Sequence, residues 1–135
     1  MRGARLLSLA LAGLAQAAAA QDGAALYRQH CASCHGADLE GQADWRSRGP
    51  DGRLAAPPHD ATGHTWHHGD DLLLRITREG KATVVGGGYD SAMPGFGDRL
   101  DDARIRRILD YIKSTWPERE RAFQKKVSGR ERVAD

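Results

Sequence analysis

Two cysteines and a histidine stand together near the start of the chain, in the order Cys31-Ala-Ser-Cys34-His35. Two thiols separated by two residues on a helical turn can each add to one vinyl group of a haem, which places the next imidazole beneath the iron. A disulfide or metal pair is the alternative, but two cysteines and one histidine leave a zinc site one ligand short. A thioredoxin-like redox couple needs a βαβ setting, and nothing nearby predicts a strand. The pattern therefore indicates one covalently attached haem c, with His35 as an iron ligand.

The candidate ligand for the other face of the iron is Met93, the one methionine that follows residue 20. This residue lies in a glycine-rich loop before Pro94, and a residue before proline favours the extended geometry that suits an inward-pointing side chain. Met/His ligation is typical of electron-transfer haems, because the soft, neutral thioether favours Fe(II) over Fe(III). A methionine that fills the core is the alternative, although a loop flanked by glycine is a poor place for one. We expect the iron to lie between His35 and Met93.

Four further histidines and a tryptophan lie within ten residues of one another: His59, His64, Trp66, His67 and His68. Short histidine-rich tracts have low specificity, so the main interpretation is a structural role or a hydrogen bond to a haem propionate. Two of the imidazoles could instead titrate near neutral pH and couple reduction to proton uptake. A second metal, copper or zinc, is the third interpretation, and the sequence leaves all three open.

The composition leaves the chain short of ordinary core residues. It has 135 residues and is 40% apolar, but 14 of the apolar residues lie in the first 20 positions. The other 115 residues include 18 leucines, isoleucines, valines and phenylalanines. That share is about 16%, and chains below roughly 20% usually bury too little apolar surface to offset chain entropy. A tethered haem is a flat apolar group that would supply the missing core, so the composition and the motif explain each other.

The first 20 residues have the pattern of a secretory signal peptide. A short positive segment, Met1–Arg5, precedes an apolar stretch, Leu6–Ala15, and a run of small residues that ends at Ala20. An uncleaved membrane anchor is the alternative, but residues 6–20 are too few, because a spanning helix needs about 20 residues. We therefore expect cleavage after Ala20 and export of a soluble protein to the periplasm.

Three helices are expected to position the candidate ligands. The first begins at Gly23, capped by Asp22, and runs up to Cys31. The second covers residues 70–79, with acids in its first turn and Gly80 just past its end. The last opens at Asp101 or Asp102 and carries apolar residues at helical spacing, namely Ile105, Ile108, Leu109, Ile112 and Trp116.

Long loops join these helices, and no useful β-alternation appears in the sequence. Loops of this length are uncommon in a compact domain unless they have a function, and here we expect them to enclose a haem. After Pro117 the chain becomes mostly charged. We therefore divide it into a signal peptide (1–20), a haem domain (21–117) and a charged C-terminal tail (118–135), the tail forming a short helix on the domain with a frayed end.

Three blocks of sequence extend the motif. They are Gly23-x-x-Leu26-Tyr27 with Cys31–Gly36, Met93-Pro94-x-Phe96, and Leu100-Asp-Asp with Leu109-Asp-Tyr111-Ile112-Lys113-Ser-Thr-Trp116. Together they resemble a class I (mitochondrial-like) monohaem cytochrome c of the bacterial periplasmic type, over residues 22 to about 117. The resemblance implies an all-α, small cytochrome c fold, with three to five helices wrapped around one covalently bound haem.

The same resemblance implies two details of the site. The first and last helices should cross beside the haem, with Gly23 and Tyr111 as candidates for the crossing. A proline carbonyl, from Pro57 or Pro58, should accept the Nδ1 hydrogen of His35 and hold the imidazole in the tautomer that ligates iron.

Three functions fit this sequence. The main hypothesis is a soluble exported electron carrier without a catalytic residue, because His35 and Met93 saturate the iron. In the second, Met93 dissociates and the protein is a haem enzyme or a gas or peroxide sensor. In the third, the chain is an electron-transfer subunit of a larger oxidoreductase.

The charge balance bears on the partners. Lys and Arg total 20 against 18 Asp and Glu, and two of the arginines, Arg2 and Arg5, lie in the leader. This near-neutral balance excludes a strongly basic nucleic-acid binder. We expect a redox donor and a redox acceptor protein, no stable membrane insertion after leader cleavage, and a monomer.

Overall fold

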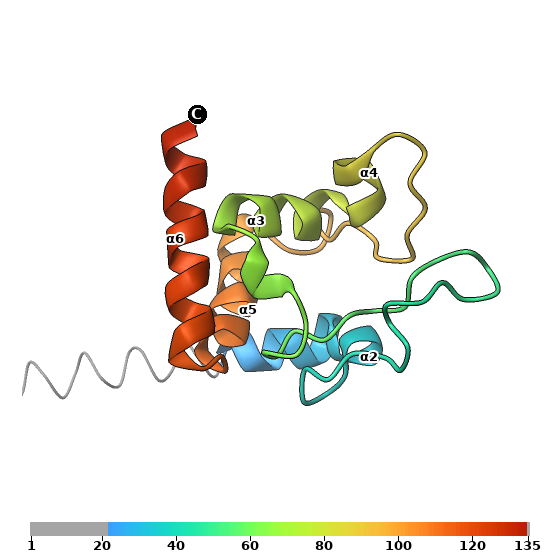
Figure 1. Ribbon diagram of the computed structural model, residues 1–135, viewed down its shortest axis with the longest axis horizontal. Coiled ribbons are helices and arrows are strands. Elements are labelled where there is room, and N and C mark those ends of the chain that lie inside the picture. The colour runs from blue at the N-terminus through green and yellow to red at the C-terminus, as the bar shows by residue number, and fades with distance from the viewer. Residues whose placement is uncertain (1–21, 135) are drawn as a thin grey trace, which may run out of the picture.

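The computed structural model describes residues 22–134, which form helices joined by long loops (Figure 1). Residues 22–30 form the first helix, and after Cys31 a further turn, α2, covers Ala32–His35. The later elements are η1 (Thr65–His67), α3 (Asp70–Glu79), α4 (Lys81–Val85), α5 (Asp102–Ser114) and α6 (Glu118–Ala134). Within the described range there is no strand, only an isolated bridge between Arg48 and Leu54. The expected all-α fold is confirmed, and the predicted leader with its cleavage after Ala20 lies outside the described residues.

The second expected helix is α3, and its bounds agree with the prediction. Asp70 and Asp71 in the first turn complement the helix dipole. The helix ends at Gly80, whose φ of 90° lies in the left-handed region that favours glycine. A side chain at position 80 would also crowd the backbone nitrogen of Gly95, at 2.9 Å. Gly80 therefore both ends α3 and lets the loop after Met93 pack against it.

The last expected helix is α5, and of its two candidate starts Asp101 is the cap and Asp102 the first helical residue. The Asp101 carboxylate accepts a hydrogen bond from the backbone N–H of Arg104 at 2.8 Å. The apolar positions of the prediction form the buried face of this helix, except Trp116, which is buried but lies beyond the helix end at Ser114.

The N-terminal helix crosses α5 at Gly23, as the resemblance implied. A Cβ atom at this position would overlap the Arg107 carbonyl oxygen and would lie 3.0 Å from the Tyr111 Cβ. Asp22 departs from expectation: it is itself helical rather than a cap, and its carboxylate pairs with the Arg107 guanidinium at 2.6 Å. Because only glycine allows this approach, position 23 fixes how closely the two helices pack.

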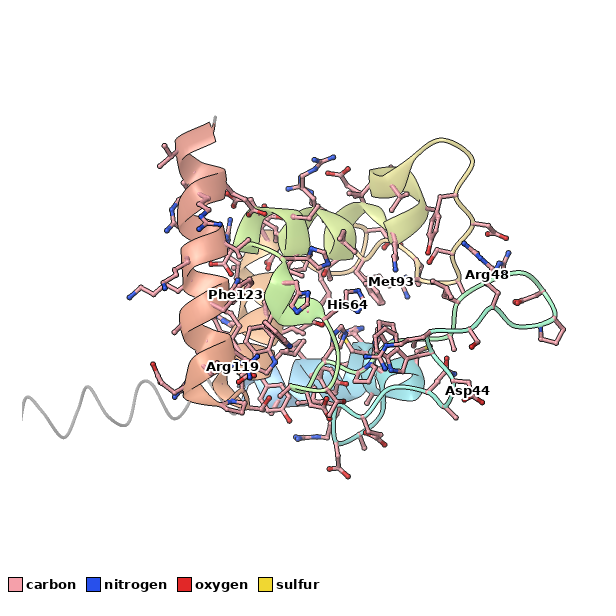
Figure 2. The ribbon with its side chains drawn as sticks, in the orientation of Figure 1. Asp44, Arg48, His64, Met93, Arg119 and Phe123 are labelled. Atoms are coloured by element: carbon pink, nitrogen blue, oxygen red, sulfur yellow. The ribbon has the colours of Figure 1, made fainter. Side chains whose placement is uncertain are left out.

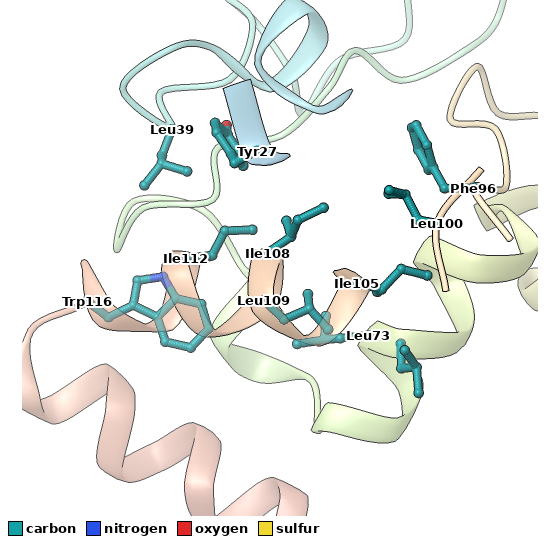
Figure 3. Packing of buried hydrophobic residues seen from close by; sticks show 11 residues of the cluster. Tyr27, Leu39, Leu73, Phe96, Leu100, Ile105, Ile108, Leu109, Ile112 and Trp116 are labelled. Carbon is teal, nitrogen blue, oxygen red and sulfur yellow. The ribbon is translucent and has the colours of Figure 1, made fainter. Parts of the chain in front are cut away.

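The buried core lies where these helices meet, with α5 at its centre (Figure 3). It contains eleven apolar residues: Tyr27, Leu39, Leu73, Leu74, Phe96, Leu100, Ile105, Ile108, Leu109, Ile112 and Trp116. Leu39, Phe96 and Leu100 come from loops rather than helices. The loops are therefore part of the packed structure, as their expected role in enclosing a ligand requires.

The charged tail differs from its expected form of a short helix with a frayed end, because α6 is a 17-residue helix. It stands beside α3 and α5 (Figure 1) and contacts η1 and the start of α3. Among residues 22–134, no helix has both the length and the apolar character that crossing a membrane requires.

Candidate haem site

The two thiols and the imidazole of the motif lie on one helical turn. The backbone N–H of Cys31 donates to the Tyr27 carbonyl at 2.8 Å, and that of His35 donates to the Cys31 carbonyl at 2.9 Å. Both cysteines are free, Cys31 half-buried and Cys34 exposed, so the disulfide alternative is not formed. Burial, reinforced by the neighbouring Cys34, raises the pKa of the Cys31 thiol to about 11. Both cysteine side chains are available for thioether bonds.

The His35 ring is held in one orientation by Pro57. Its Nδ1 lies 2.8 Å from the Pro57 carbonyl oxygen, and because a carbonyl can only accept, Nδ1 carries the hydrogen. The Nε2 lone pair is then free to bind a metal. Of the two prolines, Pro57 and not Pro58 therefore provides the carbonyl that accepts the hydrogen bond from the motif histidine.

Burial keeps the same ring neutral. His35 is 7% exposed, and this burial lowers its pKa, although the hydrogen bond to Pro57 opposes the shift; the nearby Lys81 charge lowers the pKa further. Neutral imidazole is the form that ligates iron. The prediction that His35 is an iron ligand therefore agrees with the protonation state that its surroundings favour.

Two glycines let the loop reach the motif. A Cβ at Gly41 would lie 2.6 Å from the Pro57 carbonyl carbon, and one at Gly63 would overlap the Pro58 carbonyl oxygen. Gly41 also has a φ of 69°, in the left-handed region. The Gly41 N–H donates to the His35 carbonyl at 2.7 Å, so this loop is tied directly to the motif helix.

Sequence reasoning missed the place of His59, which is stacked on the candidate iron ligand. The His35 and His59 ring centroids lie 4.0 Å apart with an interplanar angle of 24°. The Nδ1 atom of His59 lies 2.7 Å from the Thr65 hydroxyl, and its carbonyl accepts a hydrogen bond from the Trp116 indole at 2.7 Å. Burial, and then the neighbouring His35, lowers the pKa of His59 well below its ordinary value. A position after two prolines gave no signal of this contact.

The remaining histidines of the cluster point in different directions. His64 stacks on Trp45 at 5.3 Å between ring centroids, whereas His67 packs edge-on against Trp66 at 3.9 Å. His68 lies edge-on to His64 at 5.6 Å. Over residues 22–134, no three histidine, cysteine or acidic side chains converge to hold a metal ion. The described residues give no support to a second metal at this cluster, and the aromatic contacts of its histidines agree with a structural role.

Met93 lies in a loop that is hydrogen-bonded to the end of α3. Its N–H donates to the Ser91 hydroxyl at 3.2 Å, and the N–H of Phe96 donates to the Thr77 carbonyl at 2.9 Å. Figure 2 shows Met93 between α3 and α2, on the inner side of its loop. Its side chain is half-buried, so the thioether is neither core filler nor fully solvated. The role of Met93 as the second iron ligand stays a prediction.

The residues present fit a haem of the c type. They provide two free thiols on one turn, a neutral imidazole with Nε2 unprotonated, and a half-buried thioether, which are the groups such a haem uses. A cavity of about 550 Å³ lies beside the loop before Pro57 and reaches Ala92, but none of these donor residues lines it, so it is not the haem site. Cys31, Cys34, His35 and Met93 would hold the group.

The fold and this donor set define a small c-type cytochrome domain. The chain belongs to the family described as "Cytochrome C oxidase, cbb3-type, subunit III", whose pattern matches residues 18–112. Two relatives are named cbb3-type cytochrome c oxidase subunit CcoP. The one from Azospirillum brasilense is 35% identical over 98 residues, and the one from Azospirillum sp. (strain B510) is 33% identical over 92 residues.

These alignments cover 71% and 67% of this chain but only 28% and 26% of the two relatives. The chain therefore spans just over a quarter of the length of the curated relatives it matches. No solved structure matches the chain.

The family confirms the cytochrome c assignment and the cofactor: as a cytochrome c domain, the chain carries covalently bound haem c. The finer expectation, a free class I carrier, is supported only in part, because the relatives are named as subunits of an oxidase. The same names lend no support to the expected monomer or to the expected absence of membrane insertion. The helix α6 lies beyond the matched residues.

Proposed function

We propose that this chain transfers single electrons through one haem c, which is attached at Cys31 and Cys34 and ligated by His35 and Met93. The haem, when bound, supplies the one-electron iron couple. The observation that carries the proposal is the His35 ring, buried beside two free thiols with its Nδ1 hydrogen committed to the Pro57 carbonyl. No described residue is needed as an acid, base or nucleophile for this reaction.

The protein's part in this reaction is to hold the ligands still. The motif turn, the Pro57 contact and the His59 stack fix the imidazole in place, and the backbone bonds from Phe96 and Gly97 to α3 restrain the loop that carries Met93. A rigid surrounding keeps reorganisation between the two oxidation states small. That rigidity favours fast electron transfer over ligand exchange at the iron.

We further propose that the partner is a larger oxidoreductase, with this chain as an electron-transfer subunit or as its dedicated donor. The names of the two relatives support this alternative better than a freely exchanged carrier. Export to the periplasm, proposed from the pattern of residues 1–20, would place the domain on the outer side of such a complex. The test is co-purification of the tagged chain from its native membranes: an oxidase complex is expected, and recovery only as a free protein would favour the carrier.

Replacement of Met93 tests the ligand set. We expect Met93→Ala to lower the reduction potential of the holoprotein and to remove the weak long-wavelength sulfur-to-iron band of the ferric spectrum, because the thioether favours Fe(II). Ala92→Ser is the matched control in the same loop and should change neither. An unchanged potential and spectrum in Met93→Ala would refute the axial assignment.

The same variants distinguish transfer from the enzyme or sensor hypothesis. With Met93 bound to iron, the reduced wild-type protein should bind carbon monoxide slowly, and Met93→Ala should bind it rapidly. Rapid binding by the wild type would show that Met93 leaves the iron readily and would favour the sensor.

A further inference from the structure

We propose that the cavity between α5 and α6 binds a small anion that carries two or more phosphate groups. This cavity has a volume of about 370 Å³, at the lower end of the roughly 300–1,000 Å³ of small-molecule sites. It is lined by residues of α6, by Lys113 of α5, by Trp116 between these two helices, and by Asp70 at the start of α3. None of the predicted haem ligands lines it.

The lining of this cavity is strongly positive. It includes four cationic side chains, Lys113, Arg121, Lys125 and Arg132, against one carboxylate, Asp70. The Asp70 Oδ1 atom is already engaged by the Lys113 ammonium at 3.0 Å and by the Gln124 amide at 2.8 Å. Lys113 also pairs with Asp110 at 3.0 Å, and Arg121 pairs with Glu118 at 2.9 Å. Lys125 and Arg132, by contrast, pair with no carboxylate among the described residues. An anion would therefore find two cations, Lys125 and Arg132, whose charge no carboxylate of the described residues compensates.

The floor of the cavity is polar and well ordered. Gln124 and Ser128 are each 4% exposed, and the Ser128 oxygen accepts hydrogen bonds from the Asp70 N–H and the Gln124 amide, both at 3.0 Å. The Ser128 hydroxyl hydrogen has no acceptor among the described residues, so it is free to donate to a ligand. A buried hydroxyl donor beneath a cationic rim is a place that an anion, rather than an apolar or cationic molecule, would fill.

Phosphate groups fit these donors better than a single carboxylate does. The planar guanidinium groups of Arg121 and Arg132 can each donate two parallel hydrogen bonds to phosphate oxygens, and lysine ammonium groups add point charges. The two cations without a carboxylate partner, Lys125 and Arg132, also exceed the charge that a singly charged anion can balance, whereas a diphosphate carries several negative charges. A small diphosphate suits both the charge and the volume of the cavity.

Every lining residue of the cavity except Asp70 lies in the part of this chain that the family match does not cover. Three of the four cations lie on α6, and the match ends at residue 112. A bound anion would bridge Lys113 on α5 with Arg132 on α6. It would therefore strengthen the docking of α6 on the haem domain, independently of the iron ligands.

The test is calorimetric titration of the holoprotein with inorganic pyrophosphate at constant ionic strength. We expect saturable binding, and a loss of affinity of at least about tenfold in the double variant Lys125→Ser/Arg132→Ser, because each lost charged hydrogen bond is worth that much. The matched control, Lys126→Ser/Arg130→Ser, removes two exposed cations from the same helix that do not line the cavity, and it should keep the wild-type affinity. The helix content and haem spectrum of both variants, which change only exposed residues, verify that they are folded.

Two results would overturn the proposal. The wild type could fail to bind pyrophosphate, or the two double variants could weaken binding equally, which would indicate a general attraction to a basic helix. In a second arm, the holoprotein is mixed with vesicles containing phosphatidylglycerol. Binding to these vesicles without binding to pyrophosphate would assign the positive surface to lipid headgroups and not to a free anion.

Discussion

At the scale of single residues, the neighbours of His35 hold its imidazole in the form that can ligate iron. Pro57 accepts the Nδ1 hydrogen of His35, burial keeps the ring neutral, and His59 covers one face of the ring. His59 is itself held by the Thr65 hydroxyl and by the Trp116 indole. The environment thus selects the tautomer and the charge state that a metal ligand needs.

Tyr27 stabilises the backbone at the end of the haem motif. Its hydroxyl donates a hydrogen bond to the carbonyl of Gly36, the residue after His35, at 2.8 Å. The ring is fully buried, so Tyr27→Phe removes this donor and leaves the carbonyl only the longer hydrogen bond from the Leu39 N–H, at 3.3 Å. We expect a loss of about 1–2 kcal/mol in the free energy of unfolding of the holoprotein, measured with denaturant. Tyr111→Phe is the control, since the Tyr111 hydroxyl donates to no described residue. An equal loss in both variants would contradict this role of the Tyr27 hydroxyl.

At the scale of elements, the close packing of the helices depends on glycines at the points of contact. Gly23 lets the N-terminal helix touch α5, and Gly80 lets the loop after Met93 touch α3. The polar contacts of α6 lie at the start of α3, where Ser128 and Glu131 accept from the N–H groups of Asp70 and Gly69. These two N–H groups lie at the helix start, where the helix itself provides no acceptor.

Two glycine variants should have opposite effects on stability. Gly23→Ala places a methyl group against the Arg107 carbonyl, and we expect it to destabilise the fold by about 1–3 kcal/mol. Gly129→Ala, in the middle of α6, meets nothing within 4 Å and should stabilise by about 0.5–1 kcal/mol, because alanine favours the helix. Denaturant unfolding of both holoproteins is the measurement, and a neutral Gly23→Ala would show that the two helices do not approach as closely as described.

The ion pair between Asp70 and Lys113 predicts a pH dependence of stability. Burial raises the pKa of Asp70, but hydrogen bonds from Gln124 and Lys113 outweigh it and hold this pKa below its ordinary value of 3.8. A carboxyl whose pKa is lower in the folded state stabilises the fold above the unfolded value. That stability is lost as the pH falls below 3.8 through the folded pKa.

Asp70→Asn should therefore be less stable than the wild type at pH 7, with a smaller loss of stability between pH 7 and acid. The measurement is the free energy of unfolding over this range. Asp71→Asn is the control, because it removes the same charge from the same turn and Asp71 pairs with no cation in the described chain. The same acid dependence in Asp70→Asn and the wild type would contradict the stabilising role of the pair.

At the scale of the whole molecule, the features that could be predicted from the sequence are those that neighbouring residues determine, such as the bounds of the longer helices. The bounds of α3 follow from acids at its start and glycine at its end, and those of α5 follow from the Asp101 cap and apolar spacing. The short helix α4 (Lys81–Val85) was not predicted, because five residues carry too little periodicity. Local signals therefore give the main helices but not the short helix α4.

Contacts between residues far apart in the chain could not be predicted from the sequence. The choice of Pro57 over Pro58 depends on how Gly41 and Gly63 pack against this loop. The docking of α6 uses Gln124 and Ser128, which bond residues more than 50 positions earlier in the chain, and polar residues at such positions look like a solvated surface in sequence. The haem motif was predictable because its chemistry fixes both residue types and spacing within five positions.

The account depends most on the claim that a haem is covalently bound to Cys31 and Cys34 and completes a core that the side chains alone leave short. The direct measurement is the mass of the purified, denatured chain after extraction with acidic organic solvent. We predict that one haem remains on the wild-type chain and that the double variant Cys31→Ser/Cys34→Ser retains none. A wild-type chain whose mass shows no haem, or whose colour is removed by the solvent, would contradict the claim.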